Sequence, residues 1–163
     1  MGSKPIHLSL YLGPAIPLPV PQAVLDSLTS VQVHTNAGET ASGFDLTFSL
    51  GDLGTASPLL QLFQLNTGKL PPIMRTVVAV TVNGIAEVLI DGMITQYSLQ
   101  PGAGNNPSTL TLKGKDLTTV MSWIDFSGIP YPAMPDFARV ALVLAKYAPL
   151  GIIPKVIPSV LID

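Results

Sequence analysis

The chain has 163 residues and no cysteine, with 8 Lys and Arg against 10 Asp and Glu and a formal net charge of −2 at pH 7. The missing cysteines exclude disulfide bonds and thiolate chemistry, and the two histidines, His7 and His34, are too few for a multi-histidine metal site. The slightly acidic balance lacks the basic excess typical of nucleic-acid binding, and no apolar run reaches the ~20 residues of a membrane helix. Charged residues make up only 11% of the chain, so we expect an apolar surface buried against other chains rather than a monomer with a large core.

Three strands are predicted in the first half of the chain. Apolar and polar residues alternate over 6–12, and the same period places Val31 and Val33 on one face of residues 28–36. The strictest alternation runs over residues 44–50, where one face carries Phe44, Leu46, Phe48 and Leu50.

Two other segments of this half are not predicted to be strands. Residues 59–65 follow Ser57-Pro58 and predict a short helix, because proline is favoured at the first position of a helix. Residues 13–21 are rich in proline, which excludes a helix interior or a central strand and predicts an extended arm. The prolines of this arm are Pro14, Pro17, Pro19 and Pro21.

The second half centres on a predicted hairpin. Valine and threonine enrich residues 74–82, and Asn83-Gly84 is typical of a two-residue turn because both residues tolerate positive φ. The return strand covers 85–99, and Asp91-Gly92 inside it predicts a bulge or bend. After a loop, residues 108–114 predict the last strand.

Two short helices are predicted after the strands. Asp116 and Asp136 are candidate N-caps for helices over 117–124 and 137–148. The second helix would bury one stripe of its surface, formed by Phe137, Val140, Ala141 and Leu144.

Strands followed by short helices define a mainly β fold class, a β-rich α+β domain. We expect a β-barrel or a curved antiparallel sheet with one or two short helices appended. One domain would span residues 1–163. It would consist of a strand and Pro-rich arm (1–27), the sheet strands (28–114), a helical part (115–151) and an apolar tail (152–163).

The residue patterns contain no motif that predicts catalysis. There is no Gly-x-Ser-x-Gly elbow, and most carboxylates lie where turns or helix caps explain them, as Asp52 and Asp116 do. We therefore expect no enzyme activity, no cofactor and no metal site. The alternative is a small-ligand-binding or hydrolytic β-barrel, for which the first residues to test are Tyr97, His34 and Asp45.

Residues 77–154 contain short motifs that resemble the baseplate hub family of contractile phage tails and related injection machines. Members of that family include the phage late control D proteins and the N-terminal part of VgrG-type spike proteins. The motifs are the strand pair Val80-Thr81-Val82-Asn83-Gly84 and Val88 to Thr95, the strand-to-helix junction Ser108 to Leu117, and a helix that ends at Tyr147 to Ile152.

The resemblance implies a tail-tube-like barrel in a structural subunit of a tail or injection-machine baseplate. Such a subunit forms part of the hub or tube ring that joins the tail tube to the central spike, as a trimer or hexamer. The implied partners are the tail tube, the spike and other baseplate proteins, with DNA passing through the channel without specific binding and no membrane anchor. The implied location is the virion tail or an injection particle assembled in the cytoplasm.

The resemblance leaves hub, tube and tube initiator open, because a hub chain of the family carries two barrels and this sequence predicts one. Apolar surface on the predicted strands, arm and helix would make the contacts with neighbouring chains. The candidate interface residues are Trp123, Pro14, Pro17, Pro19, Pro21, Val80, Val82, Ile90 and Ile94.

Overall fold

The computed structural model of the chain describes residues 6–14, 16–36, 41–51, 74–103, 106–123, 128, 130, 133–153 and 155. The chain divides into two compact units, 1–119 and 120–163. The boundary lies close to residue 115, where the helical part was predicted to begin. The helix predicted over 59–65 and most of the apolar tail lie outside the described residues.

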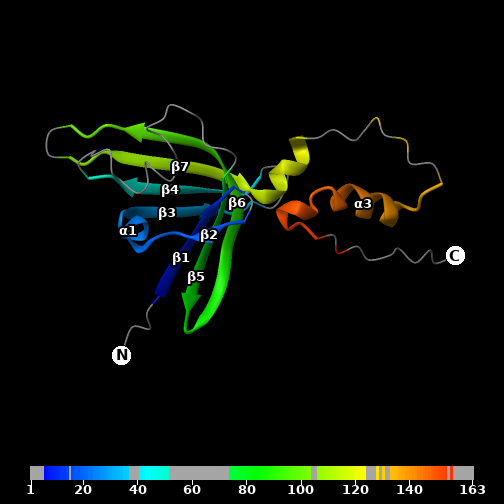
Figure 1. The fold of residues 1–163 in the computed structure, drawn as a ribbon, viewed down its shortest axis with the longest axis horizontal. Coiled ribbons are helices and arrows are strands. Elements are labelled where there is room, and N and C mark those ends of the chain that lie inside the picture. The colour runs from blue at the N-terminus through cyan, green and yellow to red at the C-terminus, as the bar shows by residue number, and fades with distance from the viewer. Residues whose placement is uncertain are drawn as a thin grey trace. The chain divides into compact units, whose positions relative to one another are not determined.

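The first unit is built around one antiparallel sheet (Figure 1). Its strands are β1 (Ile6–Gly13), β2 (Leu18–Pro19), β3 (Leu28–His34), β4 (Gly43–Ser49), β5 (Arg75–Val82), β6 (Ile85–Gln100) and β7 (Thr109–Asp116). Their order across the sheet is β2-β1-β5-β6-β7-β4-β3. The predicted mainly β fold class is confirmed.

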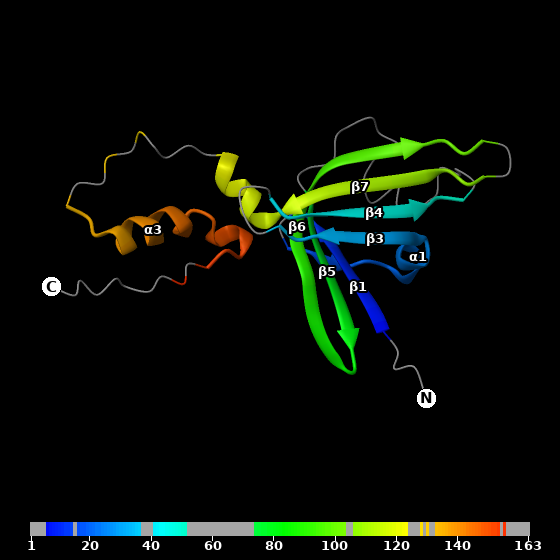
Figure 2. The same cartoon turned by 180° about the vertical axis from the view of Figure 1, so that it is seen from behind.

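The sheet is curved and open rather than closed into a barrel. Its edges are β2 and β3, and no pairing joins them in the described part of the chain. The 16-residue strand β6 pairs with β5 along its first half and with β7 along its second, and Gly92 has partners on both sides, Thr76 and Asp116. In Figures 1 and 2 the β5–β6 hairpin therefore points away from β3, β4 and β7.

The core lies where the two halves of the curved sheet face each other. The predicted period-two pattern of residues 44–50 is confirmed, since Phe44, Leu46 and Phe48 are at most 1% exposed. Complete burial of one such side chain contributes ~1.5–3 kcal/mol. The same cluster contains Leu110 and Leu112 on the neighbouring strand β7 and Val24 of the helix α1 (Gln22–Asp26). Strands β1, β5 and β6 add Leu10, Leu12, Val78 and Ile90.

The predicted hairpin turn is confirmed, whereas the predicted bulge lies elsewhere. Asn83 and Gly84 have φ angles of 57° and 80°, as a two-residue turn of this kind requires. The pairing of β6 is irregular at Leu89, on its β5 side, and at Thr95, on its β7 side. Asp91-Gly92 pairs regularly between them, so the prediction of a bulge there is wrong.

Gly92 is required for a different reason. A Cβ at this position would collide with the backbone oxygen of Lys115 and would lie 3.0 Å from Cε1 of Phe44. The glycine therefore permits close approach of a strand and an aromatic ring.

Short helices follow the sheet. Residues Leu117–Trp123 form a 3-10 helix, η2, where an α-helix was predicted. Its first turn is capped as predicted, because Oδ1 of Asp116 accepts a hydrogen bond from the backbone N–H of Thr118 at 2.8 Å. The second unit continues with α3 (Asp136–Ala145) and the 3-10 helix η3 (Ala148–Leu150).

Two predictions for α3 are wrong. Its N-cap is Pro135, and Asp136 makes no capping bond but lies in the first turn, 3.7 Å from Nη1 of Arg139. The predicted buried stripe is also not buried. No residue of α3 is buried, and Phe137 and Val140 are 40% and 49% exposed.

Candidate functional site

The turn end of the β5–β6 hairpin carries an uncovered apolar row. Ile6 of β1 pairs with Val82 of β5, which pairs with Ile85 of β6, and the three residues are 70%, 42% and 65% exposed. We call them the hairpin row. Strand alternation places the row on the same face as Leu10 and Val78 of the core. The core face of the sheet thus continues past the core and ends without cover in the described part of the chain.

Two further apolar residues of β6 are exposed near the hairpin row, although Val88 pairs with Ala79 and so lies on the opposite face of the sheet. Val88 is 62% exposed and Leu89, at the bulge, is 42% exposed. Exposed Glu87 is the one charged residue of the hairpin between Arg75 and Asp91. An apolar surface with a single carboxylate has the composition of an interface rather than of an ordinary solvated hairpin.

A bidentate ion pair holds the base of the hairpin. The Nε and Nη2 groups of Arg75 donate to Oδ1 and Oδ2 of Asp91 at 2.8 and 2.5 Å. These hydrogen bonds raise the pKa of the Arg75 guanidinium; partial burial acts in the opposite direction, and the charge of Asp91 adds to the increase. The pair links β5 to β6 at the end remote from the turn, so the exposed tip projects from a fixed base.

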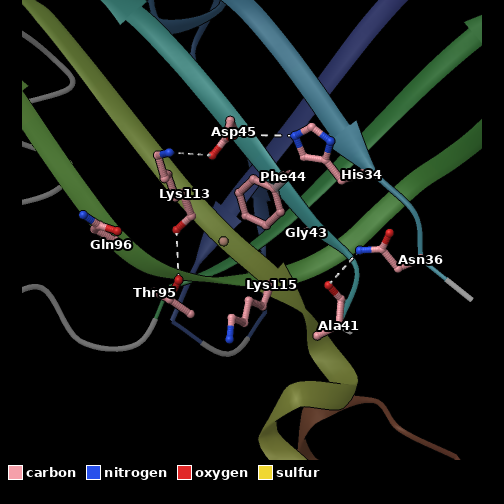
Figure 3. Close-up of a pocket in the computed structure, with 11 residues that line it drawn as sticks. His34, Asn36, Ala41, Gly43, Phe44, Asp45, Thr95, Gln96, Lys113 and Lys115 are labelled. Carbon is pink, nitrogen blue, oxygen red and sulfur yellow. Dashed lines mark hydrogen bonds and ion pairs between the residues drawn. The ribbon is translucent and has the colours of Figure 1, made fainter. Parts of the chain in front are cut away.

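A polar groove of about 380 Å³ opens on the face of β3, β4 and β7 that is opposite the core (Figure 3). One of its cross-strand rows is His34–Gly43–Lys115, and the next contains Asp45 and Lys113. A Cβ on Gly43 would lie 2.7 Å from the backbone oxygen of Gly114 on β7. The middle of the first row therefore has no side chain, which leaves space between His34 and Lys115.

The electrostatics of the groove favour an anionic group. Oδ2 of Asp45 lies 3.6 Å from Nε2 of His34, and Oδ1 lies 3.9 Å from Nζ of Lys113 (Figure 3). Both distances are longer than a hydrogen bond, so the two basic groups keep their donors available. Lys115 has no ion pair or hydrogen bond with any described residue. Since Asp45 is the only carboxylate among the lining residues, the two lysines leave an excess of positive charge.

The groove does not have the geometry of a hydrolytic site. The only hydroxyl among the lining side chains is that of Thr95, which donates to the backbone oxygen of Lys113 at 3.4 Å instead of to His34. Tyr97 lies on the other face of the sheet and packs against the core. The structure thus brings together His34 and Asp45, but not the third residue suggested for a ligand-binding barrel.

The candidate interface residues outside the arm occupy different environments. Trp123 and Val82 are 52% and 42% exposed and present apolar surface, while Val80 is half-buried. Ile90 is 5% exposed in the core and Ile94 packs against that core. These last two side chains face the interior of the unit and are not available to a partner.

The proline-rich arm lies along β1 as the short edge strand β2. Pro19 pairs with Tyr11, and the backbone N–H of Val20 donates to the oxygen of Leu10 at 3.0 Å. Pro14, Pro19 and Pro21 are exposed and Pro17 is half-buried. Proline has no N–H to donate, so this edge resists further strand pairing.

Sequence reasoning missed Ile6 and Ile85 of the hairpin row, as well as Glu87; for Lys115, which flanks Gly114 with Lys113, it weighed a contact with an acidic partner against a solvated strand end. Alternation assigns apolar strand residues to a core, whereas these two isoleucines are exposed because β1, β5 and β6 continue past the residues that form the core. Glu87 and Lys115 belong to no motif, and their importance comes from having no partner among the described residues.

Comparison of the chain with protein-family models finds no match, and comparison with curated proteins finds none either. Among the described helices, none combines the length and apolar character needed to cross a membrane. Function is therefore inferred from the surfaces described above.

Proposed function

We propose that this chain is a structural subunit of the baseplate of a contractile tail or injection machine. It forms part of the hub or tube ring that joins the tail tube to the central spike, in three or six copies, within the virion tail or the injection particle. The observation that carries this proposal is the exposed hairpin row, Ile6, Val82 and Ile85. The resemblance of residues 77–154 to hub proteins supports the same assignment.

The energetics of the hairpin row support burial against a neighbouring chain. Apolar surface removed from water stabilises an interface by roughly 25 cal/mol per Å². Only 11% of the residues are charged, so few charged side chains surround this apolar surface and keep the chain soluble. A subunit whose hairpin is covered by the next copy has no such exposed surface in the assembled ring.

The edges of the sheet also support a place in an assembly. Strand β3 contains no proline, and its outer edge is unpaired in the described part of the chain. The opposite edge, β2, is protected by proline. An unprotected edge is a hazard for a monomer and a natural point of contact for a neighbour.

The second candidate function is a small-ligand-binding protein, which the groove beside His34 and Asp45 favours. Against it, His34 and Lys113 are 58% and 54% exposed. A small-molecule site buries most of its ligand, and side chains this exposed line an open surface instead. The groove fits a charged group presented by a macromolecule better than an enclosed metabolite.

The test of the proposed function is the mass of the purified chain in solution, alone and mixed with extract of its native source. The proposal predicts three or six copies per particle, alone or with tail proteins. A single copy under both conditions, combined with saturable binding of a small ligand, would contradict it.

A further inference from the structure

We propose that Glu87 of one copy enters the groove of a second copy, with its carboxylate against Lys115 and the neighbouring His34 and Lys113. This inference rests on the proposed function, because it requires copies of the chain to lie side by side. It goes further by naming the two surfaces that meet and the charges that fix their register.

Glu87 is the one described carboxylate of the first unit that has no partner. Asp26 accepts a hydrogen bond from Gln22 at 2.8 Å, and Oδ1 of Asp116 accepts one from Thr118. The other carboxylates of the described part of this unit, Asp45 and Asp91, form ion pairs. Glu87 has neither kind of contact and is exposed.

Lys115 is the matching unpaired cation. The described Lys and Arg side chains of the first unit are Arg75, Lys113 and Lys115. Arg75 pairs with Asp91 and Lys113 lies beside Asp45, whereas Lys115 has no carboxylate partner. One negative and one positive side chain thus remain unpaired among the described residues of this unit.

The two unpaired charges cannot meet within one copy. Lys115 pairs with Met93 of β6, and Glu87 lies six residues before Met93 on that strand, roughly 20 Å away at the ordinary rise of a strand. Glu87 also stands in the row of Leu8, which packs against the core, while Lys115 stands on the opposite face. Contact between them therefore requires a second copy.

The groove has the shape and charge to receive a carboxylate. His34 and Lys115 are on strands separated by β4, which places their backbones roughly 10 Å apart with only Gly43 between them. A carboxylate in that space would meet the N–H donors of His34, Lys113 and Lys115. Bonds of this charge-assisted kind are short and directional, so they fix the register of an interface.

The apolar residues beside Glu87 would strengthen the contact. Ile85 is 65% exposed and lies two residues from Glu87 on the same face of β6, and its partner Val82 on β5 is 42% exposed. Docking of the hairpin on the second copy would exclude water around Glu87 and raise the attraction between the charges. Because the two surfaces are different, each copy offers one of each to its neighbours, and the contact is heterologous, as a closed ring requires.

Site-directed crosslinking tests the proximity directly, because the chain has no native cysteine. We would mix Glu87→Cys protein with Lys115→Cys protein under assembly conditions and add a short bismaleimide. The matched control replaces Lys115→Cys with Thr111→Cys, which is on the same face of β7 but roughly 13 Å from position 115. The proposal predicts a crosslinked dimer with position 115 and little or none with position 111.

Charge reversal tests whether the pair contributes to assembly. Glu87→Lys and Lys115→Glu should each weaken association by about tenfold or more, and the double variant should return it to within about threefold of wild type. Both side chains are exposed, so urea unfolding of each variant should match wild type.

The outcomes separate this contact from the proposed function. If the wild-type chain assembles, while the mixed Glu87→Cys and Lys115→Cys proteins give no crosslinked dimer and charge reversal does not change association, the Glu87–Lys115 contact is overturned and the ring proposal still stands. A chain that stays in single copy with its native partners present would contradict both.

Discussion

The ring of Phe44 lies over Gly114 of the neighbouring strand, in the space that a side chain at position 114 would need. A Cβ on Gly114 would overlap the edge of the ring and lie 2.7 Å from the backbone oxygen of Met93. An aromatic ring over a cross-strand glycine restores the apolar cover that glycine lacks. Phe44 is only 1% exposed, so this pairing is part of the core.

Gly114→Ala should therefore lower the free energy of unfolding by about 2–3 kcal/mol, because the added methyl group forces the Phe44 ring or the strand to move. Urea unfolding measures the change. The control is Gly128→Ala, where a Cβ would meet nothing within 4 Å. Equal stability of the two variants would show that the Phe44 ring is free to move aside.

Thr76 is a polar residue in the core, and its replacement should stabilise the protein. It is 0% exposed, and its hydroxyl has no hydrogen-bond partner among the described residues. Thr76→Val keeps the shape and removes the unpaired group, so the free energy of unfolding should rise by about 1 kcal/mol. Thr76→Ala, which leaves a cavity, should lower it. A loss of stability in Thr76→Val would mean that the hydroxyl has a partner.

Ile85 in the hairpin row should matter for association and not for folding. Ile85→Ser removes an exposed apolar group, so the free energy of unfolding measured in urea should change by less than about 0.5 kcal/mol. Self-association should weaken by about tenfold, because the apolar contact is lost. The matched control is Ile90→Ser on the same strand, 5% exposed, which should unfold the protein. Unchanged association of Ile85→Ser would remove the hairpin row from the interface.

The Arg75–Asp91 pair should couple the two strands of the hairpin. A double-mutant cycle with Arg75→Leu and Asp91→Asn should give a coupling energy of about 1–2 kcal/mol, because the pair is bidentate and only 17% and 32% exposed. Thermal or urea unfolding of the four proteins measures it. A coupling near zero would mean that water replaces the lost partner at no cost.

Local patterns predicted the strands well. Period-two alternation over residues 44–50 corresponds to β4, and Asn83-Gly84 forms the turn because local backbone preference alone decides such a turn. Local patterns did not predict where β6 bends. Its bulges at Leu89 and Thr95 arise from pairing with two different strands, whereas Gly92, the residue that suggested a bulge, serves the packing of Phe44.

The candidate site depended on long-range pairing in the same way. His34 and Asp45 were suggested as residues to test, but their proximity follows from the register of β3 with β4, which no local pattern contains. The stripe predicted on α3 failed for a related reason. An apolar stripe such as Phe137 and Val140 indicates a helix face that is favourable to bury. It does not show whether the same chain or another molecule buries that face.

Cryo-electron microscopy of the particle that co-purifies with this chain from its native source tests the central claim most directly. If the chain is a ring subunit, the reconstruction should show a threefold or sixfold ring around an axial channel. The β5–β6 hairpin of each copy should lie against the neighbouring copy. A threefold ring would assign the chain to a hub and a sixfold ring to a tube. A single chain with no associated particle would contradict the account.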